Sequence, residues 1–316
     1  KDNNHKKNTD ALDYHEFPKP GKIAVVPTKK HASQYDLSLA YSPGVAEPCL
    51  AIEENKNDAY RYTNKGNLVA VISNGTAVLG LGNIGADAAK PVMEGKGLLF
   101  KIFADIDVFD IEVNTTDVDA FVNTVKAIAP TFGGINLEDI KSPEAFEIER
   151  RLKEELDIPV MHDDQHGTAV VVLAGLINAA KLTRRNLADC KFVVIGAGAA
   201  GTAIIKLLHL YGARNIVAVD SRGIVGASRT DLNAEKTALL EYVDASQTGS
   251  IEDAITDSGV FIGVSRAGLL TPELVQKMAE HPIIFALANP VPEIMPDVAR
   301  EAGVAVIATG RSDFPN

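Results

Sequence analysis

The sequence contains no tryptophan and only two cysteines in 316 residues. Cys49 and Cys190 lie far apart and form no Cys-x-x-Cys pair, so a disulfide framework or a zinc ribbon is not supported and a reducing compartment fits. Apolar runs of about 18 residues, the length that crosses a membrane, are also lacking. The polar start, residues 1–10, has no apolar core of a secretory signal, so we expect a cytoplasmic protein.

Positive charge is scarce as well, because 31 basic residues face 42 acidic ones and the formal net charge is -11. This balance argues against a nucleic-acid partner and against an anionic membrane surface. It does not exclude a small anionic ligand, since a bound metal or a few cations can reverse the local field. The hydrophobic share of 46% is enough for the cores of two domains of ordinary size.

The second half of the chain alternates apolar runs of strand length with helical patterns. This rhythm predicts an α/β fold with a doubly wound parallel sheet of the Rossmann type. Its strands are expected at residues 192–195, 216–219, 260–264, 283–286 and 304–308, with a helix at 203–211. We place the domain boundary near residue 165, so that a smaller α/β domain (1–165) precedes a nucleotide-binding domain (166–316).

The first half is less regular, and its elements are predicted one by one. Strands are expected at 68–73, 98–103, 134–137 and 158–161, and helices at 117–129 and from Ser142 to Leu156. Ser142 can cap the second of these helices, with Pro143 at its first position. A further helix at 168–182 is apolar nearly all round, which predicts an interior position.

The pattern Gly-x-Gly-x-x-Gly occurs twice, at Gly80 to Gly85 and at Gly196 to Gly201. The second copy has a strand before it, a helix after it and an acid, Asp220, at the end of the next strand, as dinucleotide binding requires. Asp105 lies at a similar distance after the first copy, which remains the less favoured alternative because it follows the Asn74-Gly75 turn. We therefore assign the second copy to the dinucleotide, with the pyrophosphate on the helix N-terminus. The first copy, which Pro91 soon follows, is interpreted as a glycine-rich turn that packs or lets a substrate approach.

Two acidic pairs, Glu138-Asp139 and Asp163-Asp164, each follow a short predicted strand. In a parallel sheet both pairs would emerge at the carboxyl edge, where ligands bind. Carboxylates that meet there repel one another unless a cation intervenes, and oxygen ligands select Mg²⁺ or Mn²⁺ over zinc. The alternative is a solvated loop or a helix cap, since acidic pairs are common at helix starts. His162 and His166 have the spacing of a zinc helix, but a strand-to-turn transition is expected to break that helix.

At this point the residues resemble the malic enzyme family, specifically its small bacterial branch. The matching segments follow in order over almost the whole chain: Leu39–Ala46, Leu79–Gly85, Pro91–Lys96, Asn136–Asp139, His162–Ala169, Ala288–Pro290 and Thr309–Asp313. The opening Leu12–Lys22 resembles the hybrid type, in which a phosphotransacetylase-like domain follows the malic enzyme domain. The resemblance thus implies a possible further domain in the full-length protein, and also a homodimer.

The resemblance implies a site as well as a reaction, the oxidative decarboxylation of malate to pyruvate and carbon dioxide with NAD(P) and a divalent metal. The implied metal ligands are Glu138, Asp139 and Asp164. The implied acid-base pair is Tyr41 and Lys96, with Asp163 beside Lys96. The implied cofactor residues are Gly196, Gly198, Ala199, Ala200, Gly201, Asp220, Arg222 and Asn289.

The sequence departs from the family pattern at two places, and it does not decide between NAD and NADP. Larger relatives carry an arginine for the malate carboxylate in the segment aligned with residues 75–78, where this chain has Ala77, so another cation must serve. The family's paired asparagines, expected just beyond Asn316, are absent because the chain stops. Asp220 favours NAD through the ribose hydroxyls, whereas Arg222 can accept a 2′-phosphate. Similar hybrid enzymes keep an Asp-Ser-basic stretch here and use NADP, so NADP is preferred.

The expected chemistry begins with malate bound through its 2-hydroxyl and carboxylate at the metal. Lys96 would take the hydroxyl proton, hydride would leave C2 for the nicotinamide, and Tyr41 would protonate C3 after decarboxylation. Two other readings remain at this stage. One is a metal-free Rossmann dehydrogenase of another small acid, which leaves the carboxylates idle; the other is a nucleotide-binding regulatory module without catalysis.

Overall fold

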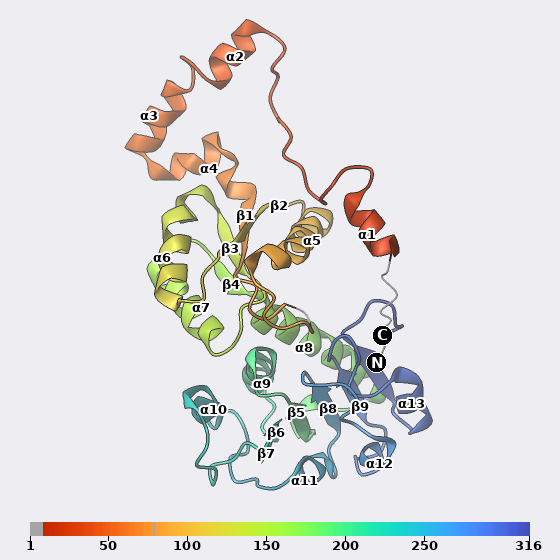
Figure 1. Cartoon of the computed structure of the whole chain (residues 1–316). Coiled ribbons are helices and arrows are strands. Elements are labelled where there is room, and N and C mark those ends of the chain that lie inside the picture. Colours follow the sequence, from red (N-terminus) through yellow and green to blue (C-terminus); the bar gives the residue numbers. More distant parts are fainter. Residues whose placement is uncertain (1–8, 79) are drawn as a thin grey trace. The chain divides into compact units, whose positions relative to one another are not determined.

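The computed structural model describes residues 9–78 and 80–316, so most of the polar start and Leu79 of the resemblance lie outside the described residues (Figure 1). By its internal contacts the chain divides into two compact units. The first comprises the residues up to Val78, Asn83–Glu138 and Ile148–Val160, and the second comprises the segment ending at Gly82, Asp139–Glu147 and Met161–Asn316.

The first unit is built on a four-stranded sheet in the order β2-β1-β3-β4. Its strands are β1 (Leu68–Ser73), β2 (Asp107–Glu112), β3 (Gly134–Leu137) and β4 (Val160–His162), of which β4 continues into the second unit after Val160. The strand β1 pairs in parallel with β2 and with β3, and both β1 and β3 are buried almost throughout. The helices α5 (Ala86–Ala104), α6 (Val118–Ile128) and α7 (Glu144–Glu155) flank this sheet, with α5 and the pair α6 and α7 on opposite faces (Figure 1).

The helix α5 corrects one prediction. Residues 98–103 were expected to form a strand, but they are the last turns of this 19-residue helix, which also contains Pro91. Its buried residues Ala86, Ala89, Met93 and Gly97 recur at spacings of three and four, the helical period. A six-residue segment with five apolar residues and Lys101 cannot by itself distinguish a strand from a helix end, and the longer periodicity of α5 shows that it is helical.

Between residue 9 and the sheet lie the helices α1 (Thr9–Glu16), α2 (Gln34–Ala40), α3 (Ala46–Glu54) and α4 (Ala59–Tyr62). Ser33 caps α2 in a capping box with Asp36. None of α2, α3 and α4 contains a buried residue. Short 3₁₀ turns complete the unit: Lys56–Asp58, Asn64–Asn67 and Ala129–Thr131.

The second unit contains a six-stranded sheet in the order β10-β9-β8-β5-β6-β7. Its strands are β5 (Phe192–Ile195), β6 (Ile216–Asp220), β7 (Gly223–Ile224), β8 (Val260–Gly263), β9 (Ile283–Ala286) and β10 (Val306–Thr309). The pairs β10–β9, β9–β8, β8–β5 and β5–β6 are parallel, and β6 pairs antiparallel with β7. The sheet is extended from β5 on both sides, by β6 on one side and by β8, β9 and β10 on the other. This order is that of a doubly wound sheet, so the prediction is confirmed.

Side chains alternate between two cores because successive strand residues point to opposite faces. On one face Phe192 and Val194 pack with α8 (Asp163–Thr183) and α9 (Ala199–Tyr211). On the other, Val193 and Ile195 pack with α11 (Ile251–Ile255), α12 (Pro272–Val275) and α13 (Pro296–Glu301). The remaining helical pieces are α10 (Ala234–Leu239) and the 3₁₀ turn Leu187–Asp189. Each buried aromatic such as Phe261 stabilises the unit by about 1.5–3 kcal/mol.

The helix α8 corrects a second prediction, because it is not buried all round. Ala169, Val172 and Leu176 form its buried face, whereas Val170 is 59% exposed and Val171 64%. By length and composition α8 is the one helix in the described ranges that could cross a membrane, and such a single helix is weak support for a span. Its buried face packs on α9 and the nucleotide-domain core instead.

Candidate functional site

Three carboxylates meet at the end of β3 and the start of α8. Glu138, Asp139 and Asp164 each offer one oxygen atom, and these atoms lie within 4.8 Å of one another. The backbone N–H of Asp139 donates a 2.8 Å hydrogen bond to Asp164 Oδ2, which ties the two segments together. Glu138 and Asp139 are buried. Negative charges that lie this close together away from water are stable only when a cation or a proton lies among them. An all-oxygen donor set fits a hard divalent ion such as Mg²⁺ or Mn²⁺.

Polar neighbours hold these carboxylates in place. Asn136 Nδ2 donates a 2.8 Å hydrogen bond to Glu138 Oε2. His162, which is fully buried at the end of β4, places Nε2 3.1 Å from Asp164 Oδ2 and Nδ1 2.9 Å from the side chain of Gln165. His162 is the last residue of β4 and His166 lies in α8, so the two histidines do not share a helix, as predicted. The predicted turn between them is wrong, because α8 begins directly at Asp163 and not at residue 168.

Lys96 lies on α5 with Nζ 3.1 Å from Glu138 Oε1, so the expected base stands beside an expected ligand. Asp163 is half-buried in the first turn of α8, where its carboxylate lies against Gly167. Tyr41 follows α2 and is 78% exposed. Ala77 is half-buried and carries no charge, so the missing arginine has no substitute at that position.

A glycine turn lies at the carboxyl end of β5, where the dinucleotide cradle was predicted. Gly196 has φ +111°, and a Cβ there would meet Val264 O at 2.6 Å. At Gly201 a Cβ would stand 1.8 Å from Gly196 O, so this glycine allows α9 to pack onto the turn. At Gly198 nothing lies within 4 Å of a Cβ, which leaves open space at the N-terminus of α9, the position predicted for a pyrophosphate.

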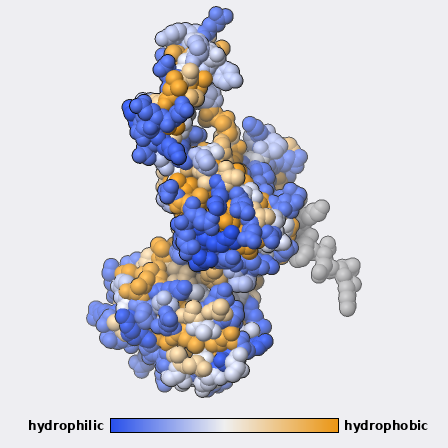
Figure 2. Space-filling model, turned by 90° about the vertical axis from the view of Figure 1, so that its left-hand side faces the viewer, coloured by the Kyte–Doolittle hydropathy of each residue, from blue (hydrophilic) through white to orange (hydrophobic). Residues whose placement is uncertain are grey.

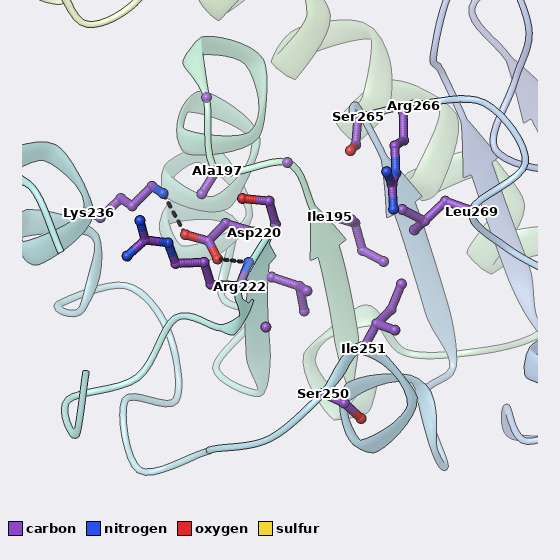
Figure 3. A pocket seen from close by; sticks show the side chains of 15 residues that line it. Ile195, Ala197, Asp220, Arg222, Lys236, Ser250, Ile251, Ser265, Arg266 and Leu269 are labelled. Atoms are coloured by element: carbon purple, nitrogen blue, oxygen red, sulfur yellow. Dashed lines mark hydrogen bonds and ion pairs between the residues drawn. The ribbon is translucent and has the colours of Figure 1, made fainter. Parts of the chain in front are cut away.

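This turn opens into a cavity of about 600 Å³ whose wall includes Asp220, Arg222, Lys236 and Arg266 (Figure 3). Asp220 accepts hydrogen bonds from the Arg222 backbone at 2.9 Å, from Arg229 at 2.7 Å and from Lys236 at 2.5 Å. Although burial opposes ionisation, these donors together lower the pKa of Asp220 to about 2. The carboxylate is therefore charged but already neutralised by two cations.

Sequence reasoning found Asp220 and Arg222 but missed Arg229 and Lys236. Arg229 and Lys236 lie 9 and 16 positions after Asp220 in the sequence. Only the folding of the segment between β6 and α10 brings them next to the Asp220 carboxylate. Asn289 follows β9 and is exposed, with its backbone oxygen 3.0 Å from the Cβ position of Gly80. The first glycine fingerprint thus packs: Gly80 against Asn289, and Gly75 against Gly85, where a Cβ would stand 2.1 Å from the carbonyl oxygen.

Comparison with known families identifies the family of the chain. Residues 20–117 and 112–153 match the family model of the malic enzyme N-terminal domain, and residues 165–315 match that of the malic enzyme NAD binding domain. The chain belongs to the malic enzyme family. The second match contains the glycine turn at Gly196, so the second fingerprint is the one in the NAD binding domain.

Similar proteins carry both cofactor names. The bifunctional malic/malolactic enzyme of Bacillus subtilis is 61% identical over 89% of this chain and 69% of its own length. The NADP-dependent malic enzyme of Escherichia coli is 57% identical over 97% of this chain, which spans 41% of that relative. A crystal structure of an NAD-dependent malic enzyme from Thermotoga maritima superposes with a TM-score of 0.93 at 50% identity, over 97% of this chain and 82% of the other. The expected family and fold are confirmed.

Proposed function

We propose that this chain carries the catalytic site of an NAD(P)-dependent malic enzyme that converts malate to pyruvate and carbon dioxide. The observation that supports it most is the carboxylate cluster with Lys96 ion-paired to Glu138, in a chain that also contains a dinucleotide cradle. A metal-free dehydrogenase would leave three clustered, mostly buried acids without a purpose. We assign residues 1–165 to substrate, metal and proton transfer, and residues 166–316 to the dinucleotide.

Glu138, Asp139 and Asp164 would hold Mg²⁺ or Mn²⁺. When bound, that cation polarises the malate hydroxyl and the carbonyl that replaces it. Oxidation of malate removes a hydride from C2 and a proton from the hydroxyl, and Lys96 Nζ would accept that proton. After carbon dioxide leaves, Tyr41 would return a proton to C3, and Asp163 and Asn289 would help to orient Lys96 and the nicotinamide side. Each proton transfer contributes roughly 10²- to 10⁴-fold to the rate.

The test is absorbance of the reduced cofactor with malate and Mn²⁺, measured with NADP and then with NAD. We expect turnover that a chelator abolishes and Mn²⁺ restores. Folded protein that binds dinucleotide but never reduces it would overturn the enzyme and leave a nucleotide-binding module. Turnover that survives chelation would favour the metal-free dehydrogenase.

We further propose NADP as the preferred cofactor and the cytoplasm as the location. The cations around Asp220 support the first, since Arg222, Arg229 and Lys236 outnumber Asp220 and Asp231 by one charge. The free Cys49 and Cys190 fit the second. A phosphotransacetylase-like domain in the full-length protein stays a prediction from the opening segment.

A homodimer is also proposed, and the exposed arm α2–α4 supports it. Its apolar side chains include Leu37 (55% exposed), Leu50 (59%) and Tyr41 (78%), and apolar surface is visible on the part of the chain that carries these helices (Figure 2). Exposed apolar side chains gathered on one segment mark protein–protein contacts. A second copy would cover them and enclose Tyr41.

Light scattering after size exclusion tests the dimer, and mixing two inactive variants tests where Tyr41 acts. Tyr41→Phe and Lys96→Ala subunits would be unfolded together and refolded as mixed dimers. If Tyr41 serves the site of the second copy, the mixture regains activity, because one site of each mixed dimer has both groups. A monomer in solution would contradict the dimer, and a silent mixture would place both groups in one subunit.

The name of the Bacillus subtilis relative suggests a second product. Pyruvate that remains bound beside the reduced nicotinamide can take the hydride back at C2, together with a proton, and leave as lactate. Quantifying lactate and pyruvate with stoichiometric cofactor tests this. Lactate formed without net cofactor reduction would add malolactic activity, and pyruvate as the sole product would exclude it.

A further inference from the structure

Glu293 is a buried carboxylate of the second unit that belongs neither to the metal cluster nor to the lining of the cavity. Glu293 is 0% exposed to solvent. Oε1 accepts a 3.0 Å hydrogen bond from the backbone N–H of Ser265, and Oε2 accepts another of 3.0 Å from Ala288. Burial raises its pKa, and these two backbone donors oppose that rise by stabilising the charged form.

The two donors belong to different loops at the same edge of the sheet. Ser265 follows β8 and lines the dinucleotide cavity together with Arg266 and Leu269. Ala288 follows β9 and directly precedes Asn289. The strands β8 and β9 are parallel neighbours, with Gly263 opposite Ala286, so both loops leave the sheet side by side. One carboxylate therefore joins the cavity wall to the segment that carries Asn289.

The surrounding backbone is shaped to admit this carboxylate. A Cβ on Gly263 would stand 2.4 Å from Glu293 Cδ, so only glycine lets the side chain pass the end of β8. The backbone continues the same link, because Leu270 N–H donates to Glu293 O at 3.0 Å and Gly268 N–H to Pro292 O at 3.2 Å. The β8 loop is thus held both by the side chain and by the main chain of the Glu293 segment.

We infer that Glu293 is a positioning residue for dinucleotide binding and for hydride transfer, acting through the Ser265 and Ala288 loops. This inference rests on the proposed malic enzyme function only for the role of Glu293 in hydride transfer. A buried carboxylate that only fills space would be replaceable by its isosteric amide. A double acceptor is not, because glutamine presents one N–H₂ group to a backbone N–H and loses that hydrogen bond.

The test compares Glu293→Gln with Glu301→Gln, an exposed glutamate on α13. NADH and NADPH fluorescence titrations give the dissociation constant without turnover, and steady-state kinetics give kcat and KM. We expect Glu293→Gln to fold, to weaken dinucleotide binding about tenfold and to lower kcat, with faster amide exchange in both loops. Glu293→Asp, which keeps two acceptors, should recover part of the affinity, whereas Glu301→Gln stays like the wild type.

If folded Glu293→Gln had the dinucleotide affinity, the kcat and the amide exchange of the wild type, the positioning role of Glu293 would be overturned. If that variant does not fold, amide exchange of the wild-type protein decides. The N–H groups of Ser265 and Ala288 should be protected without dinucleotide, and rapid exchange of either would overturn the inference. Binding and exchange need no malate turnover, so failure of the proposed enzyme activity and failure of the Glu293 role are separate results.

Discussion

The backbone N–H of Asp139 donates a 2.8 Å hydrogen bond to the carboxylate of Asp164, and Asp139 itself has φ +53°. The left-handed conformation turns the chain sharply after β3, so that consecutive residues Glu138 and Asp139 can both join the cluster. Aspartate and asparagine tolerate this conformation better than residues without a polar side chain. Asp139 thus forms the turn and is also a proposed metal ligand, and substitutions can test the two roles separately.

Asp139→Asn and Asp139→Ala should both weaken Mn²⁺ binding about tenfold or more, because each removes a charged ligand. Asp139→Ala should in addition lower the free energy of unfolding by about 1 kcal/mol, since alanine disfavours a positive φ. Asp257, exposed and with φ +58°, offers the matched control. Thermal unfolding with and without Mn²⁺ should show that Asp257→Ala destabilises the protein and leaves the metal response intact. Equal Mn²⁺ stabilisation of wild type and both Asp139 variants would remove Asp139 from the ligand set.

Lys96→Ala should lower kcat by roughly 10²- to 10⁴-fold, the usual contribution of one proton transfer. Dinucleotide binding, which uses residues of the other unit, should not change. Lys101→Ala on the same helix is the control, because Lys101 pairs with Asp105 and Asp107 at the surface. Steady-state kinetics of both variants and a Mn²⁺ thermal shift of each distinguish a lost base from a damaged metal site. A Lys96→Ala enzyme with near-normal kcat would exclude Lys96 as the base.

Periodicity predicted most of the fold, because strands buried on both faces give continuous apolar runs and helices give a stripe. It failed at residues 98–103, where the apolar end of α5 has the length of a strand. It also failed for α8, because Val170 and Val171 are apolar but exposed, and composition does not reveal which face of a helix is covered.

The site was predictable where its residues follow strands, as Glu138 and Asp220 do, since parallel strands deliver their ends to one edge. Tyr41 and Lys96 came from the family resemblance alone, because a tyrosine after a helix and a lysine on one have no distinguishing pattern. Lys236 and Glu293 were missed because Asp220 lies 16 residues before Lys236 and Ser265 lies 28 residues before Glu293, and only the folded loops bring these partners together.

The cofactor preference should depend on Lys236. It pairs with Asp220 Oδ2 and lines the cavity, so Lys236→Ala removes a cation and frees one oxygen of Asp220 (Figure 3). Both changes disfavour a 2′-phosphate and favour ribose hydroxyls. We expect the dissociation constant of NADP to rise about tenfold, and that of NAD to stay within about twofold, for the loss of one charge-assisted contact. Binding of 2′-AMP and 5′-AMP, measured by calorimetry, isolates the phosphate, with exposed Lys277→Ala as control. An equal loss for both nucleotides would contradict NADP preference through Lys236.

Stability should also depend on pH through Glu112, at the end of β2. Burial, and then its neighbour Asp110, raise the pKa of Glu112 to about 7, although Lys90 opposes the shift. Between about pH 4.5 and pH 7 the folded protein therefore holds a proton that the unfolded chain has released, so the free energy of unfolding falls as pH rises through this window. After allowance for solvent screening the change is on the order of 1 kcal/mol. Asp220 does not interfere, because its pKa of about 2 places its contribution to stability below this window.

Urea denaturation at pH 5 and pH 8 gives the free energy of unfolding at each pH. The difference between the two values should be smaller for Glu112→Gln than for wild type or for exposed Glu54→Gln. The Glu112→Gln protein should also be the most stable of the three at pH 8, since it has no carboxylate to ionise beside Asp110. Identical pH differences in all three proteins would show that Glu112 ionises normally in the fold.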